Sequence, residues 1–148
     1  MSGSPDHLSP SIIDEEHRGI EREIVNLMEA LLLGASSAKV EETAMEVLRA
    51  NLTHFENEEA ILKAAGFEKL EEHRAEHATI AGVLKRIVEE LKNKESVVAL
   101  RSLREYRRLL LVHLQDEDER YREAVNRYAA EQGRPPLPPR IRHALPET

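Results

Sequence analysis

The feature that most constrains this chain is a stretch at 54–77 in which histidines and glutamates recur at helical spacing. It reads H-F-E-N-E-E-A-I-L-K-A-A-G-F-E-K-L-E-E-H-R-A-E-H. His54 and Glu58 are four residues apart, and the interval recurs at His73 and His77. Residues at i and i+4 lie on one face of a helix, so two helices would each present a pair of donors to a common interior. Imidazole and carboxylate groups together bind iron, zinc or manganese, and the stretch therefore predicts a metal site.

Apolar residues recur with a period near 3.6 through most of the chain, which predicts four long helices. The first ends at Gly34, the second is capped by Ser36 or Ser37 and ends at Gly66, and the fourth runs from Ser96 to about Ala130. Short links between long helices are typical of an up-down-up-down four-helix bundle. We therefore predict an all-α fold with a metal site in its core, formed by residues 11–132 and preceded by an N-terminal arm at 1–10.

The composition excludes several classes of function. The net charge is −7, which disfavours nucleic-acid binding, and the chain has no cysteine for disulfides, thiol catalysis or thiolate-bound zinc. No apolar run approaches the roughly 18–20 residues that span a bilayer, and the polar first ten residues do not resemble a secretory signal. We expect a soluble cytoplasmic protein that binds neither nucleic acid nor membrane.

A proline-rich C-terminal tail occupies residues 133–148. It begins G-R-P-P-L-P-P-R, which cannot continue a helix and favours an extended conformation. Pro135, Pro138 and Arg140 fit a P-x-x-P-x-R pattern that some recognition domains bind. The simpler interpretation is a tail that folds back over the end of the bundle, and a partner for the tail is the alternative.

Five of the seven histidines fall on the inward stripes of the predicted helices, with at least one on every helix. They are His17, His54, His73, His77 and His113. Each alone would more often be a hydrogen-bonded core histidine than a ligand. Together they leave many buried polar groups that need partners, at about 1–3 kcal/mol for each missing one. Metal ions would satisfy all of them at once, whereas His7 and His143 lie in the terminal arms.

The joint pattern resembles the hemerythrin family of di-iron proteins, which includes bacteriohemerythrins and HHE cation-binding domains. The resemblance is carried by I-D-E-E-H at 13–17, by the whole 54–77 block and by H-L-Q-D-E-D-E-R-Y at 113–121. It implies two iron ions joined by an oxo or hydroxo bridge. The implied iron ligands are His17, His54, Glu58, His73, His77, His113 and Asp118. Three of the histidines (His73, His77 and His113) would bind one iron and two (His17 and His54) the other, with Glu58 and Asp118 bridging.

The ligand count implied by the resemblance leaves one position open on the two-histidine iron. The family's activity is reversible binding of dioxygen at that position, for oxygen transport, storage or delivery. Another small diatomic molecule or peroxide is an alternative ligand. Candidates to line an apolar oxygen pocket are Ile20, Phe55, Leu110 and Leu114.

The last carboxylate ligand has two candidates. From His113, Glu117 is an i,i+4 step and turns about 40° around the helix, whereas Asp118 is an i,i+5 step and turns about 140°. Geometry alone favours Glu117, as in HHE domains with H-x-x-x-E in both halves. The H-x-x-x-x-D-x-x-Y pattern that ends at Tyr121 instead resembles hemerythrin proper and favours Asp118.

Glu21 is the position that bears most on function. The resemblance implies Phe here, four residues after His17. A glutamate that turns outward would be one more solvated acid. A glutamate that faces the open iron position could act as an extra ligand or proton donor, which favours a di-iron oxidase, oxygenase or peroxidase. Iron or nitric-oxide sensing is a third reading, and the oxygen-binding protein is the leading hypothesis.

Overall fold

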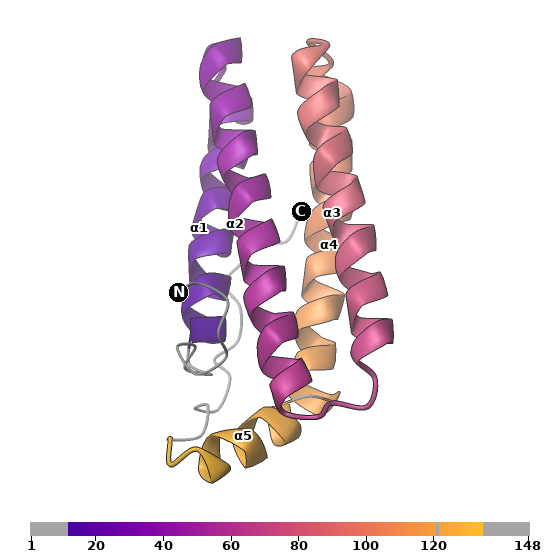
Figure 1. The fold of residues 1–148 in the computed structure, drawn as a ribbon. Coiled ribbons are helices and arrows are strands. Elements are labelled where there is room, and N and C mark those ends of the chain that lie inside the picture. Colours follow the sequence, from indigo (N-terminus) through magenta and orange to yellow (C-terminus); the bar gives the residue numbers. More distant parts are fainter. Residues whose placement is uncertain (1–11, 121, 135–148) are drawn as a thin grey trace.

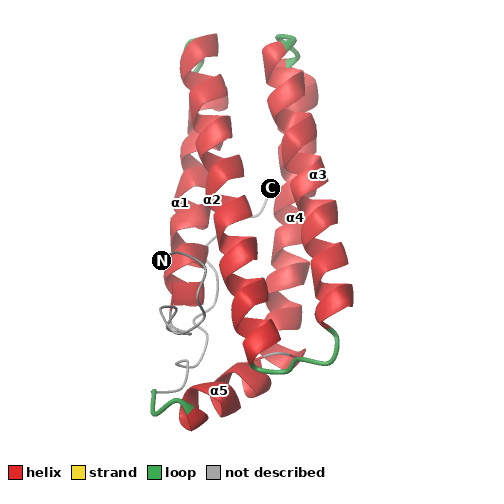
Figure 2. Ribbon diagram, viewed as in Figure 1, coloured by secondary structure: helices red, strands yellow, loops and turns green. Residues whose placement is uncertain are grey.

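The computed structural model describes residues 12–120 and 122–134, and every regular element in these ranges is a helix (Figure 2). The side chains of residues 12 and 114–120 are not among those described. The helices are α1 (Ile12–Leu32), α2 (Ser37–Ala64), α3 (Leu70–Lys92), α4 (Ser96–Arg120) and α5 (Arg122–Glu131). The prediction of an all-α fold is therefore confirmed for this part of the chain. Within it, no helix has the length and apolar character that crossing a membrane requires.

The four long helices lie alongside one another, and α5 lies across one end of them (Figure 1). Each long helix contacts the next in sequence, and α1 also contacts α4. The links that follow α1 and α3 lie at one end, whereas the link between α2 and α3 lies at the other end, near α5. This arrangement brings all four long helices around one interior.

Local signals in the sequence explain where α2 begins and ends. Ser36 caps its start, where Oγ accepts a hydrogen bond from a backbone N–H of the first turn. At its end, Gly66 has a φ of +71°, which a glycine adopts without steric cost. The N–H of Phe67 donates to the carbonyl of Leu62 (3.0 Å) and that of Gly66 to the carbonyl of Lys63 (3.1 Å). These are the two hydrogen bonds of a Schellman motif, and they turn the chain toward α3.

Two apolar clusters occupy the interior, one on each side of the histidines along the helices. The larger cluster fills the end near the α1–α2 link and includes Ile24, Leu27, Val47, Leu84, Ile87 and Leu103. The smaller consists of Ile13, Ile61, Leu62 and Val125, with Phe67 and Leu70 packed against it. On α1, His17 lies between Ile13 of the smaller cluster and Ile20 of the larger one. On α2, His54 and Glu58 likewise lie between residues of the two clusters. The polar site therefore separates the two apolar clusters.

The fourth predicted helix differs from the observed one at its C-terminal end. The periodicity predicted one helix to about Ala130, but α4 ends at Arg120 and a separate α5 follows from Arg122. Helix α5 lies across the end of the bundle because its apolar residues are buried there. Val125 is fully buried in the smaller cluster. An ion pair between Arg122 and Asp14 of α1 (3.0 Å) adds to this contact. Periodicity continues through such a turn and does not reveal it.

Candidate metal centre

The centre of the site is the carboxylate of Glu58 on α2, which is fully buried. Its Oε1 faces three histidines: it is in close contact with Nε2 of His73, 2.9 Å from Nε2 of His77 and 3.5 Å from Nε2 of His113. Its Oε2 faces two others, at 3.0 Å from Nε2 of His54 and 3.7 Å from Nε2 of His17. One carboxylate thus divides the five imidazoles into a group of three and a group of two.

Each long helix contributes to this site because its inward stripe carries a histidine. Helix α1 provides His17, α2 provides His54 with Glu58, α3 provides His73 and His77, and α4 provides His113. The five imidazoles are at most 7 % exposed, so all lie in the core of the bundle. The two i,i+4 pairs work as the spacing predicted, since both members of each pair face the same interior.

The donor atoms form two groups that could each hold a metal ion. One group is Glu58, His73, His77 and His113, the other is His17, His54 and Glu58, and within each group the donor atoms lie within 4.8 Å of one another. Nε2 of His77 and Nε2 of His113 are 3.1 Å apart. Two nitrogens bound at about 2.1 Å to adjacent positions of one ion lie about 3 Å apart. The spacing therefore suits neighbouring ligands of a common metal.

Three further glutamates surround the site and bind its histidines from outside. Nδ1 of His54 donates to Glu16 (3.0 Å), Nδ1 of His77 donates to Glu59 (2.7 Å), and Nδ1 of His113 donates to Glu76 (3.0 Å). A carboxylate at Nδ1 selects the tautomer in which Nε2 carries a lone pair. The sequence analysis did not identify these three acids. The signal was their position, because each is adjacent in sequence to a residue predicted as a ligand.

This tautomer shows why the site suits a metal. With Nδ1 protonated, the Nε2 lone pairs of His54 and His77 face the lone pairs of Glu58 at 3.0 and 2.9 Å. Such acceptor–acceptor contacts are repulsive unless a cation lies among them. Imidazole and carboxylate donors in this number suit a first-row transition metal such as iron, so the donor set fits the implied ions.

Aromatic and apolar side chains close the site on its inner side. The ring of Phe55 stacks on that of His77 with 4.0 Å between centroids and lies 5.8 Å from that of His54. Ile20 and Leu110 are buried, each at 2 % exposure. Of the four residues predicted to line an oxygen pocket, these three are buried, and Phe55 packs directly against the ring of His77.

Several predicted site residues lie elsewhere or outside the description. The side chains of Leu114, Glu117 and Asp118 lie outside the described residues, so the choice between the two acids stays a prediction. Glu21 is half-buried on α1 and is in neither of the two groups of metal donors found in the described part of the chain. The proline-rich tail and the N-terminal arm fall almost entirely outside the described ranges. The metal-ligand roles of the clustered residues also stay predictions.

A buried tyrosine lies on the core side of the site. Tyr106 of α4 is fully buried. Burial raises the pKa of its phenol above the ordinary value, and the nearby side-chain amide of Asn51 on α2 opposes that rise. Asn51 itself donates from Nδ2 to the carbonyl of Val47 (3.0 Å). The phenol therefore stays protonated at neutral pH.

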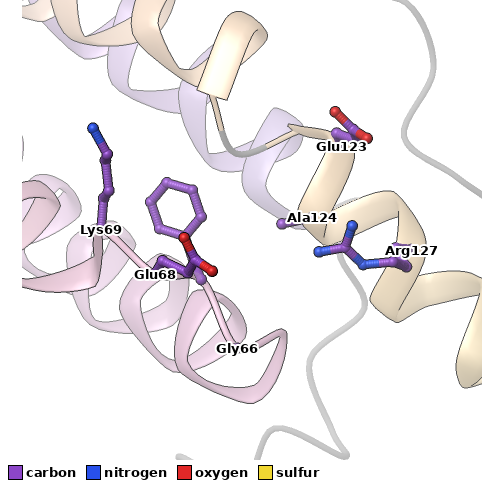
Figure 3. A pocket seen from close by; sticks show the side chains of 7 residues that line it. Gly66, Glu68, Lys69, Glu123, Ala124 and Arg127 are labelled. Carbon is purple, nitrogen blue, oxygen red and sulfur yellow. The ribbon is translucent and has the colours of Figure 1, made fainter.

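Two cavities adjoin the site without opening onto Glu58. The larger, of about 500 Å³, lies between the α2–α3 link and α5 and is lined by Gly66, Phe67, Glu68, Lys69, Glu123, Ala124 and Arg127 (Figure 3). Phe67 separates it from the histidines, since its ring lies edge-on to that of His73 at 6.3 Å. The smaller, of about 180 Å³, is a mainly apolar groove beside α3 and α4 whose lining includes Glu76 and His113.

Fold and site together define a helical protein whose candidate metal donors come from all four long helices. The sequence matches the hemerythrin HHE cation-binding domain over residues 9–125. This match covers most of the chain, and the protein belongs to the hemerythrin family. The resemblance found in the sequence is thereby confirmed. No curated protein and no solved structure matches the chain.

Proposed function

We propose that this protein holds two iron ions within an up-down-up-down four-helix bundle and binds dioxygen reversibly at that centre. The observation that carries the proposal is the position of Glu58. Its two oxygens face different histidine groups, three at Oε1 and two at Oε2. A carboxylate in this position suits a bridge between two ions with unequal numbers of protein ligands. The unequal count supports an open position on one ion.

In this proposal, one set of residues holds the ions and a second, apolar set shields them from water. His73, His77 and His113 would hold one ion, His17 and His54 the other, and Glu58 both. A pair of iron ions, when bound, supplies two electrons to dioxygen and takes them back on release. The buried side chains of Ile20, Phe55 and Leu110 exclude water from the site. Withholding protons in this way favours release of dioxygen over its further reduction.

The test combines metal analysis with an oxygen titration. We expect about two iron ions per chain. We expect the anaerobic ferrous protein to gain a visible charge-transfer band in air and to lose that band when oxygen is removed. Glu58→Ala should abolish iron binding, whereas Glu56→Ala, at an exposed position of the same helix, should not. Iron bound without a reversible change on oxygen cycling would contradict the proposal.

The alternative function is that of a di-iron oxidase, oxygenase or peroxidase. It is favoured by Glu21, which is half-buried one helical turn beyond His17 on α1. A carboxylate there could deliver a proton and promote oxygen reduction. Glu21→Phe should then slow oxidation of the ferrous protein in air, whereas Glu29→Gln, at an exposed position of the same helix, should not. Equal oxidation rates in the Glu21 variant and the parent would remove this residue from the chemistry.

A further inference from the structure

The three glutamates that bind the site histidines from outside (the outer glutamates) repeat one pattern of contacts through the bundle. Glu16 of α1 binds a histidine of α2, Glu59 of α2 binds a histidine of α3, and Glu76 of α3 binds a histidine of α4. Each carboxylate thus reaches from one helix to the imidazole of the next. The repetition at three successive helix pairs sets these contacts apart from scattered surface ion pairs.

The pattern has a simple geometric origin. Each outer acid is adjacent in sequence to an inner donor on its own helix: Glu16 to His17, Glu59 to Glu58, and Glu76 to His77. Successive residues of a helix point about 100° apart. When one of two neighbours points into the core, the other therefore points along the flank, toward the adjoining helix. One dipeptide on each of three helices supplies both an inner and an outer group.

Two of the outer carboxylates are themselves held in place. Asn57 of α2 donates from Nδ2 to Glu16 (2.6 Å), and Arg74 of α3 donates from Nε to Glu59 (3.3 Å). The side chains of Glu16 and Glu59 are 19 % and 24 % exposed, and that of Glu76 is 38 % exposed. Carboxylates that are partly withdrawn from water act more strongly on a nearby charge than fully solvated ones.

We propose that Glu16, Glu59 and Glu76 are positioning residues that tighten metal binding and lower the reduction potential of the centre. Each one fixes the ring orientation of a histidine and points its Nε2 lone pair inward. Each also places a negative charge behind an imidazole, which makes the imidazole a stronger donor and stabilises the more highly charged, oxidised ions. The three contacts act on both histidine groups, because His54 faces Oε2 of Glu58 while His77 and His113 face Oε1.

This inference rests on the proposed metal centre but not on oxygen reversibility. The experiment uses the full chain with Glu16→Gln, Glu59→Gln and Glu76→Gln, which keep size and hydrogen-bonding capacity but remove the charge. Glu105→Gln is the matched control, because Glu105 pairs with Arg86 (2.7 Å) on the surface of α3 and α4. Iron affinity is measured by competition with a chelator, and the midpoint potential by redox titration of the iron-loaded protein.

We expect each of the three variants to bind iron about 10–100-fold more weakly than the parent and to have a higher midpoint potential. The control should match the parent in both. A merely structural role would lower the melting temperature and leave the potential unchanged, and that result would overturn the inference. Iron binding without reversible oxygenation would contradict the proposed function alone. A parent protein that takes up no iron would contradict both the proposed function and the role of the three glutamates.

Discussion

The two ends of the bundle hold their helices together by different means. Near the α1–α2 link, the interior is a continuous apolar cluster that includes Leu27, Val47 and Leu84. Toward α5, the interior holds five imidazoles and a carboxylate, and the apolar cluster beyond them has four buried members among the described residues. Burial of apolar surface stabilises the first end by itself, at about 25 cal/mol per Å². The second end gains less of this stabilisation from its small cluster, and cations bound among its donors would add to it.

The difference shows how the bundle can tolerate a polar site. Facing lone pairs and buried imidazoles destabilise the end of the bundle toward α5. The apolar end near the α1–α2 link holds the four helices in register. The site can therefore be prearranged before metal binds. The predictions below test this division, beginning with the largest expected effect.

Removal of metal should affect the α5 end most. Metal that binds only the native state at a thousand times its Kd stabilises it by about 4 kcal/mol, so chelation should lower the melting temperature markedly. Hydrogen exchange followed by mass spectrometry should show the largest loss of protection at 54–62 and 70–77, with little change at 84–91. Equal loss of protection along all four helices would contradict the division.

A cavity in the apolar end should cost the same with and without metal. Leu84 is almost fully buried, and Leu84→Ala should lower the free energy of unfolding by about 2–5 kcal/mol. Because Leu84 belongs to the larger apolar cluster and lies about two helical turns from His77, urea unfolding of the iron-loaded and iron-free proteins should give the same difference from the parent. A cost that depends on iron would mean that the two ends are coupled.

A substitution in the site should show the opposite behaviour. His17 is buried between apolar neighbours of α1 and makes the longest of the contacts with Glu58 (3.7 Å). His17→Leu should change the stability of the iron-free protein by no more than about 1 kcal/mol, because an apolar side chain suits the position. In the iron-loaded protein it should cost more, through the lost ligand. Urea unfolding in both states measures the difference, and equal costs would count against a ligand role.

The smallest expected effect is at the boundary between the two ends. Tyr106→Phe should change the free energy of unfolding by no more than about 1 kcal/mol at neutral pH, because the phenol Oη has no hydrogen-bond partner among the described residues. Because the pKa of Tyr106 is raised in the folded state, its contribution is fully present below about pH 10 and is lost as the pH rises further. The variant should therefore lose less stability than the parent above pH 10, as measured by urea unfolding across that range. Parallel curves would contradict this.

Sequence reasoning predicted the helices and the inward positions of the clustered histidines because both depend on spacing along one helix. His54 with Glu58 and His73 with His77 needed only the i,i+4 rule, and Gly66 with Phe67 needed only the local Schellman pattern. The separation of α5 from α4 was missed, since the apolar period continues from α4 into α5. The outer glutamates were missed because their partners lie on neighbouring helices. In the sequence, only their position beside a predicted ligand distinguishes Glu16, Glu59 and Glu76 from other charged residues on a solvated face.

The tight turn at Gly66 has a consequence for how this family can change. Glu58 and His73 point at the same place only while a link of constant length sets the rotation of α3 relative to α2. One residue inserted within either helix, between Glu58 and the turn or between the turn and His73, would carry that donor about 100° around the helix axis relative to the turn. Insertions and deletions should thus be tolerated in the α1–α2 and α3–α4 links at the other end of the bundle. The stretch between His54 and His77 should keep a constant length.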